Sequence, residues 1–359
     1  MLSLYLHIPF CRRKCAYCAF CSQTGSETQK ERYAQALCRA IEDAAGRETR
    51  PLSTFYIGGG TPALLGTERL CRVIEVVKRQ FAHSADWEFT VECNPESTTD
   101  DLLATLKAAG VNRISMGVQS LQNNELTALG RLHDRDGALA ALERIFKAGF
   151  QNVSVDVMYG IPHQTEQSFA DTLDTLLSYP ITHLSSYALQ LEEGTPLAAT
   201  AQPMEEELEE RLWLLLCERA KAAGMVHYEI SNFGKEGCFS RHNLAYWRRT
   251  DYIGLGASAH SFWRGTRYSA PADLEEYCKN PQFSQNPIPI SPTEAEEEAI
   301  LLGLRTFEGV SLTQLAGIDL SRYRDFSTIE NGRFSLNERG YYLSNSIISD
   351  ILYKKDTIS

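Results

Sequence analysis

The chain has 359 residues, 43% of them hydrophobic, and its 35 Lys and Arg against 46 Asp and Glu leave a formal net charge of −11. This length can bury a sizeable core, so we expect one large domain with a smaller one, whereas the acidic balance argues against general charge attraction to nucleic acid or an anionic membrane. No apolar run approaches the roughly 18 residues of a membrane-spanning helix, and the start of the chain lacks the basic segment and cleavage site of an export signal, so we expect a cytoplasmic protein.

From the N-terminus to about residue 190, short β-branched and aromatic runs alternate with segments of helical period. This alternation is typical of a parallel sheet with crossover helices. We predict strands over residues 3–8, 53–58, 87–92, 112–118, 152–158 and 183–189, with helices over 67–81, 98–110 and 136–150 between them. Two of these helices open with a Thr or Asp suited to capping, and two run into a Gly suited to ending a helix. Six such units predict an α/β fold, a TIM-like partial (β/α)6 barrel within residues 1–225.

The remaining chain shows three further patterns. A long acidic helix begins near Glu205, with Trp213, Leu214 and Leu216 available to pack. Residues 226–292 are rich in aromatic residues and Gly, and we expect loops and short strands there. After residue 292 we predict helices over 293–305 and 311–317, a strand and turn over 332–340, and a last helix. These elements suit a small winged-helix-like module over residues 293–359, although it has no basic recognition helix.

Three cysteines stand directly after the first predicted strand. Cys11, Cys15 and Cys18 have the spacing C-x3-C-x2-C, and Cys21 follows three residues later. Soft thiolate ligands select iron–sulfur clusters or zinc, and so short a loop can hold three irons of a [4Fe–4S] cluster. A zinc site that uses all four cysteines and a set of unliganded thiols are the alternatives. We refer to Cys11, Cys15 and Cys18 as the loop cysteines.

Other candidate site residues lie where the predicted strands end. Glycines 58–60 open a turn in which the backbone can approach a ligand closely. Glu92 and Gln119 end the third and fourth strands, and Asp156 lies within the apolar fifth strand. In barrels, ligand-binding groups come from the carboxyl ends of the strands. We therefore expect these residues and the loop cysteines to face one mouth of the barrel.

The order and spacing of several motifs identify a family. The stretches YLHIPFCRRKCAYC, YIGGGTP, VECNP, GVQS and DVMYGIPHQT resemble those of the radical S-adenosylmethionine enzymes related to oxygen-independent coproporphyrinogen III dehydrogenase. The later stretches HYEISNF, RHNLAYWRR and YIGLGASAHS, together with the C-terminal module, resemble the heme-chaperone branch of that family. The resemblance covers nearly the whole chain and implies the radical S-adenosylmethionine form of the partial barrel.

The resemblance also implies roles for individual residues. The loop cysteines would bind a [4Fe–4S] cluster and leave one iron for the amino and carboxylate groups of S-adenosylmethionine, which a reduced cluster cleaves to a 5′-deoxyadenosyl radical. The residues implied to lie around the cluster and this cosubstrate are Tyr5, Gly59, Gly60, Thr61, Glu92, Gln119, Arg131 and Asp156. Cys21 departs from the dehydrogenase pattern, in which a fourth Cys stands two residues after the third, and we expect it to be a spare thiol.

One histidine is the candidate residue for binding a second ligand, a porphyrin. Most of the eight histidines have structural interpretations, whereas His163 and His260 lie in predicted loops where either interpretation is open. His242 begins HNLAYW, which offers an imidazole next to flat apolar surface on a predicted accessible loop, as an axially ligated porphyrin requires. The resemblance implies heme binding at this motif.

Two functions of different class follow. The first is a heme chaperone that carries heme to respiratory target proteins, for which transient contact with membrane proteins and a homodimer are further expectations. The second is an enzyme that oxidatively decarboxylates coproporphyrinogen III. Only ten residues precede Cys11, and the dehydrogenase has a longer segment there, so we expect the chaperone and no dehydrogenase activity.

Overall fold

The computed structural model describes residues 1–358, and Ser359, the last residue of the predicted C-terminal module, lies outside the described residues. All six predicted strands form. They are β1 (Leu2–Ile8), β2 (Leu52–Gly59), β3 (His83–Cys93), β4 (Arg113–Gln119), β5 (Asn152–Tyr159) and β6 (His183–Ala188). These strands lie side by side in chain order, and each pairs with the next in parallel. The predicted α/β fold with a parallel sheet is therefore confirmed.

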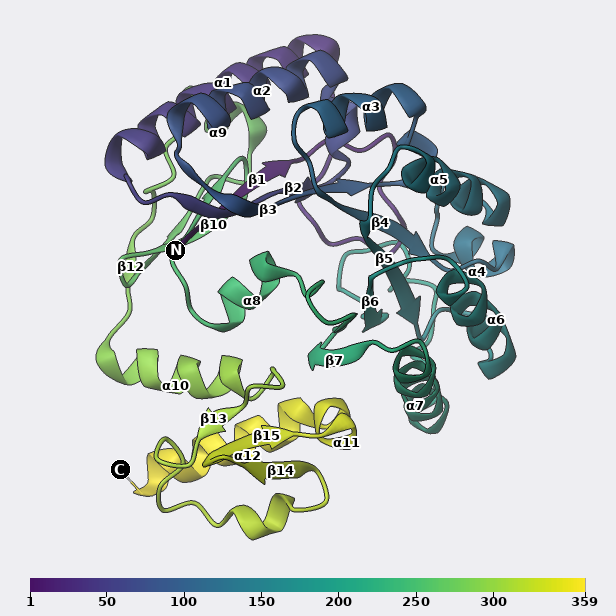
Figure 1. Cartoon of the computed structure of the whole chain (residues 1–359), viewed down its shortest axis with the longest axis vertical. Coiled ribbons are helices and arrows are strands. Elements are labelled where there is room, and N and C mark those ends of the chain that lie inside the picture. The colour runs from purple at the N-terminus through teal and green to yellow at the C-terminus, as the bar shows by residue number, and fades with distance from the viewer. Residues whose placement is uncertain (359) are drawn as a thin grey trace.

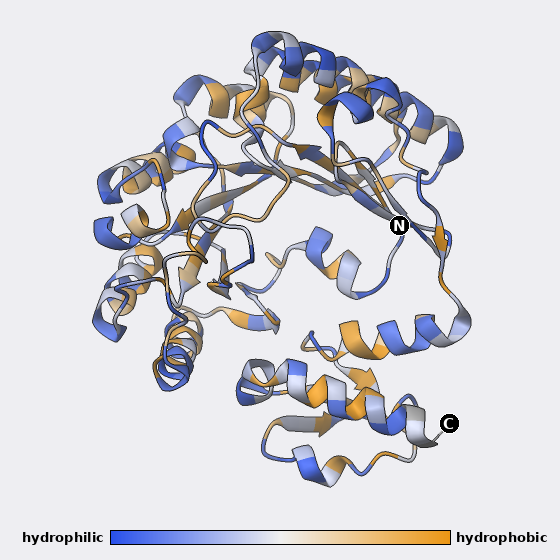
Figure 2. Ribbon diagram, turned by 180° about the vertical axis from the view of Figure 1, so that it is seen from behind, coloured by the Kyte–Doolittle hydropathy of each residue, from blue (hydrophilic) through white to orange (hydrophobic). Residues whose placement is uncertain are grey.

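The helices that alternate with these strands, and the helix after β6, cover the outer face of this sheet (Figure 1). They are α1 (Glu27–Arg47), α2 (Thr67–Gln80), α3 (Asp100–Ala108), α4 (Asn123–Ala128), α5 (Arg135–Lys147), α6 (Glu166–Leu177) and α7 (Glu206–Ala222). Two of the helices are capped by a Thr or Asp, but not by the first residues of the predicted ranges: Thr99 accepts a hydrogen bond from the N–H of Leu102, and Asp134 accepts one from the N–H of Gly137. Figure 2 shows hydrophilic and hydrophobic residues alternating along these helices, as expected for helices with one buried face. In α7, Trp213 and Leu216 are buried as predicted, but Leu214 is exposed.

Residues 226–292 extend the same sheet at both edges. Four strands, β9 (Tyr252–Leu255), β10 (His260–Trp263), β11 (Thr266–Ser269) and β12 (Ile288–Pro289), continue it beyond β1, and β9 is parallel to β1. At the other edge β8 (Asn232–Gly234) pairs with β6, and β7 (Val226–Glu229) pairs with β8. The segment also contains α8 (Arg241–Trp247) and α9 (Leu274–Lys279), which the sequence pattern did not predict. Helix α8 lies across the inner side of the curved sheet (Figure 1).

The C-terminal residues form a small antiparallel sheet flanked by helices. Its strands are β13 (Val310–Ser311), β14 (Ser327–Glu330) and β15 (Arg333–Leu336), and its helices are α10 (Pro292–Gly303), α11 (Glu338–Tyr342) and α12 (Ser344–Ile358). The predicted helix over 311–317 is wrong: Ser311 pairs with Arg333, and the turns that follow end at Gly317 with a positive φ. A short 3-10 helix, η3 (Leu320–Tyr323), follows them. The division of the chain into a barrel over residues 1–225, a segment over 226–292 and a module over 293–359 stays a prediction. Within residues 1–358, no helix is long and apolar enough to cross a membrane.

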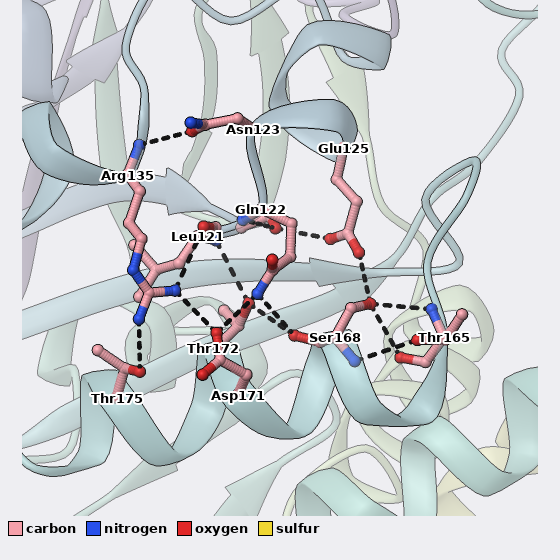
Figure 3. A network of polar contacts seen from close by, with 11 residues as sticks. Leu121, Gln122, Asn123, Glu125, Arg135, Thr165, Ser168, Asp171, Thr172 and Thr175 are labelled. Carbon is pink, nitrogen blue, oxygen red and sulfur yellow. Dashed lines mark hydrogen bonds and ion pairs between the residues drawn. The ribbon is translucent and has the colours of Figure 1, made fainter.

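A polar network connects α4, α5 and α6, buried around Glu125 and partly exposed at the Arg135–Asp171 ion pair (Figure 3). The Glu125 carboxylate is fully buried and accepts hydrogen bonds from the hydroxyls of Ser120 and Ser168, each at 2.6 Å. Arg135 donates to Asp171 at 2.7 Å. Because buried charge is costly without partners, this network specifies one arrangement of the three helices. It thereby fixes both ends of the short loop between α4 and α5.

Candidate cluster and cosubstrate site

The loop cysteines line one cavity of about 410 Å³ at the carboxyl ends of the parallel strands. Backbone hydrogen bonds hold their loop, from Cys11 to Gln23 at 2.9 Å and from Ala16 to Leu129 at 2.9 Å. Burial raises the pKa of the Cys11 and Cys18 thiols, and the neighbouring loop cysteines raise it further. The three cysteines therefore share one partly buried environment.

Cys21 is separated from the loop cysteines. Its side chain lines a second cavity and donates to the carbonyl of Ala272 at 3.5 Å. Among the described residues, no three His, Cys, Asp or Glu side chains converge on a single metal ion.

The glycine turn after β2 packs directly against the cysteine loop. A Cβ atom on Gly60 would lie 2.9 Å from the Cys11 sulfur and 2.7 Å from the Phe10 carbonyl oxygen, and one on Gly58 would lie 2.6 Å from the Glu92 carboxyl carbon. Gly59 has a φ of 112°, which side chains rarely allow. Gly58 and Gly60 therefore have to be glycine because a side chain would collide with neighbouring atoms, and Gly59 because of its backbone conformation.

Two acidic side chains face the cavity from β3 and β5, the strands on either side of β4. Glu92 accepts hydrogen bonds from the Tyr56 hydroxyl at 2.8 Å and the Gly59 N–H at 2.9 Å, and burial raises its pKa to about 7. Asp156 accepts from Ser115 at 3.2 Å, and burial raises its pKa to about 6. The Arg113 guanidinium opposes both shifts electrostatically. Both carboxyl groups can therefore exchange protons near neutral pH.

Arg131 joins the cysteine loop to the strand ends. Its guanidinium donates to Asn94 at 2.8 Å and to the Gly117 carbonyl at 2.7 Å, and one nitrogen lies 3.6 Å from the Cys15 sulfur. Asn94 in turn donates to the Thr61 hydroxyl at 2.8 Å. The loop between α4 and α5, fixed by the network around Glu125, therefore places one cation against the sulfur site.

Gln119 ends β4 in a left-handed conformation, with a φ of 69°. Its side chain is buried and accepts a hydrogen bond from the Tyr187 hydroxyl at 3.2 Å. A non-glycine residue in this region costs free energy and persists only where its surroundings require it. The backbone conformation and the hydrogen bond from Tyr187 together hold the Gln119 amide at the wall of the first cavity.

The first cavity is lined by every predicted residue of this mouth except Gly58 and Tyr5. The Tyr5 hydroxyl hydrogen-bonds to His7 at 2.9 Å, and the residue lines the second cavity. Gly59 and Glu92 line both cavities. Tyr5 therefore lies on the other side of this shared wall from the first cavity.

The first cavity also contains residues that the sequence analysis missed, among them Asn94, Arg113 and Tyr187. Asn94 directly follows Glu92 and Cys93 at the end of β3, so the strand-end rule could have included it. Arg113 begins β4 and is 2% exposed. Its side chain forms no hydrogen bond within residues 1–358. Its burial depends on strands distant in sequence, and no local signal reveals it.

The predicted accessible loop around His242 is wrong. HNLAYW forms most of α8, and Glu88 fixes the start of that helix by accepting from the N–H groups of Arg241 and His242. The imidazole is 1% exposed and uses both nitrogens, with Thr54 at 2.7 Å and Tyr246 at 2.8 Å. Heme ligation by His242 would require one of these bonds to break.

A parallel partial barrel with a three-cysteine loop and a glycine turn at its mouth defines a radical S-adenosylmethionine protein, and residues 5–176 match the model of the radical SAM superfamily. The chain is 34% identical to the heme chaperone HemW of Bacillus subtilis, over 96% of each chain. It is 36% identical to HemW of Escherichia coli K12, over 72% of this chain and 69% of that protein. The chain belongs to the HemW family of radical SAM proteins.

A solved structure shares the fold over the whole chain. The coproporphyrinogen III oxidase HemN of Escherichia coli has a TM-score of 0.83, 22% identity, and coverage of 100% of this chain and 90% of that one. At this identity the likeness confirms the architecture alone.

Proposed function

We propose that this protein binds heme and passes it to heme-accepting proteins of the respiratory chain, and that it carries a [4Fe–4S] cluster and S-adenosylmethionine in the first cavity. The single observation that carries the proposal is the cavity shared by the loop cysteines, Arg131 and the two carboxyl groups. The heme function is supported by the names of relatives that match nearly the whole chain.

The residues of the first cavity fit a cluster with an open iron. Three soft thiol donors face one space, the fourth nearby cysteine lines another, and Gly60 leaves room at the Cys11 sulfur. Thiolate sets of this kind are the usual ligands of iron–sulfur clusters. We propose Cys11, Cys15 and Cys18 as the ligands and Cys21 as a spare thiol.

The same cavity offers groups suited to a zwitterionic cosubstrate. We propose that Gly59, Gly60 and Thr61 meet its amino group, and that Arg131 pairs with its carboxylate. The remaining contacts are proposed for Glu92, Gln119 and Asp156. When bound, the reduced cluster supplies the electron that cleaves the sulfonium; the protein positions the molecule and excludes water.

The test compares heme retention with porphyrinogen turnover in one preparation. Anaerobically reconstituted protein is passed over a desalting column after incubation with heme, and is separately incubated with coproporphyrinogen III, S-adenosylmethionine and a reductant. We expect retained heme and no protoporphyrinogen. Protoporphyrinogen formed over repeated turnovers would establish the dehydrogenase instead, and loss of heme on the column would contradict the chaperone.

A further inference from the structure

The second cavity, of about 570 Å³, adjoins the cluster cavity and combines aromatic and basic side chains. Tyr246 from α8, Tyr252 from β9 and Phe262 from β10 form aromatic walls, and Phe20 of the cysteine loop is 68% exposed at its edge. The volume falls within the range of ligand sites for medium-sized organic molecules. Such walls suit a flat apolar ligand.

Two arginines in this cavity share one carboxylate. Arg249 and Arg267 both form ion pairs with Glu298 of α10, and both guanidinium groups lie over the Phe262 ring, at 5.2 and 5.8 Å from its centroid. Within this group of three side chains, one carboxylate faces two guanidinium groups, so the group carries one net positive charge; Glu92 lies in another wall of the same cavity. Because arginine forms bidentate pairs with carboxylates, this end of the cavity suits an anionic ligand carrying carboxyl groups.

His260 presents a free imidazole to the same cavity. Six of the eight histidines use a ring nitrogen in a hydrogen bond, including His7 and His242 beside this cavity. Within residues 1–358, the rings of His163 and His260 form no hydrogen bond. Of these two histidines, only His260 lines the cavity. An exposed imidazole without a partner can donate its lone pair to a metal.

The backbone that carries His260 is held in a strained turn. Gly256 and Ser258 have φ angles of 117° and 62°, and the Ala257 N–H donates to the Tyr33 hydroxyl at 3.0 Å. A Cβ on Gly256 would lie 2.6 Å from both the His7 carbonyl oxygen and the Tyr33 hydroxyl. Strain of this kind is maintained where the surrounding structure imposes it, often at functional sites. The turn gives His260 a fixed position beside the aromatic walls.

We propose that the second cavity is the heme site, with His260 as an axial ligand and Arg249 and Arg267 receiving the propionates. Tyr246 and Tyr252, which pack edge to face with 4.5 Å between their ring centroids, contact one side of the macrocycle. This inference rests on the proposed heme function. The neutral imidazole donates its lone pair to the iron, and a water ligand leaves. His242 acts as a positioning residue, since its hydrogen bond to the Tyr246 hydroxyl sets the orientation of that ring.

The test is a heme titration of the reconstituted full-length protein, followed by the Soret band. We expect His260→Ala to weaken heme binding at least tenfold and to lose the imidazole-type spectrum, and added free imidazole to restore that spectrum. His163→Ala is the matched control, because His163 is exposed and lies outside the cavity. Cys21→Ala is measured as well, because this thiol lines the same cavity and is the competing axial donor; we expect it to keep the imidazole-type spectrum.

The arginines are tested with heme and its iron dimethyl ester, which lacks the carboxylates. The wild type should prefer heme by tenfold or more, and Arg267→Gln should lose most of this preference without moving the Soret band. Arg264→Gln, an exposed arginine outside the cavity, is the control.

The outcomes separate this site from the function on which it rests. Wild-type heme binding with unchanged binding in both His260→Ala and Arg267→Gln would overturn the site and leave the function standing. Spectra altered only in Cys21→Ala would assign the axial position to that thiol and contradict His260. No heme binding by the wild type would overturn both proposals.

Discussion

Replacing His242 by Ala should cost stability because of what its ring holds together. The imidazole lies between the Thr54 and Tyr246 hydroxyls and stacks on Tyr56, with 4.9 Å between ring centroids. Its removal leaves two buried hydroxyl groups without these partners, and each unsatisfied group costs about 1–3 kcal/mol. A cavity the size of the ring adds to this cost. We therefore expect the free energy of unfolding to fall by about 3 kcal/mol or more, a large share of the total for an ordinary domain.

The assay is urea unfolding at pH 7.5, followed by circular dichroism, with His163→Ala as a control expected to change stability by less than about 0.5 kcal/mol. Burial, with a smaller effect from Arg113, lowers the pKa of His242 to about 3, whereas a histidine in the unfolded chain titrates near 6.5. Between these values the unfolded chain binds more protons at this site, so wild-type stability falls on acidification through His242. The deficit of His242→Ala should therefore shrink from pH 7.5 to pH 5. A deficit below about 1 kcal/mol at pH 7.5 would refute this account of the ring.

Three further predictions concern the cluster cavity. Replacing any loop cysteine by Ala should abolish the broad visible absorption and most of the iron after anaerobic reconstitution, whereas Cys21→Ala should keep about four irons per chain; equal loss in Cys21→Ala would show a fourth ligand. Arg131→Ala and Asp156→Ala should each weaken S-adenosylmethionine binding in calorimetry while iron content is unchanged, and wild-type affinity in both would contradict the proposed cosubstrate site. Burial raises the pKa of Glu92 to about 7, so its folded form binds more protons than the unfolded chain between about pH 4.3 and 7. The stability that this group contributes is present below that window and is lost as pH rises through it. Glu92→Gln should therefore flatten the dependence of the free energy of unfolding on pH in this range. An unchanged pH dependence would refute the raised pKa of Glu92.

The parallel strands were predictable because each is a local run of β-branched and aromatic residues. Strand β9 was missed as a core strand because only Tyr252–Leu255 form it, and its Gly-rich surroundings suggest a loop. Its place beside β1 depends on backbone pairing between residues far apart in sequence, such as Ser3 with Tyr252, which no local pattern shows.

The cysteine loop, the glycine turn and the strand-end acids were predictable for a similar reason, since each lies at a fixed position after a strand. The burial of His242 was not, because Thr54 and Glu88 reach α8 from β2 and β3. In sequence, HNLAYW and the segment around His260 look alike, as aromatic stretches with one histidine. Only the structure separates the buried imidazole from the exposed one.

The most direct test of a heme chaperone is the kinetics of heme transfer to an acceptor. Heme-loaded protein is mixed in a stopped-flow instrument with increasing concentrations of a heme-free respiratory hemoprotein, and in parallel with apomyoglobin as a passive trap. We predict that the transfer rate to the respiratory acceptor rises with its concentration, because heme passes within a complex, whereas the rate to apomyoglobin stays constant. A rate that is the same for both acceptors at every concentration would contradict the chaperone function, since it would show only spontaneous release of heme.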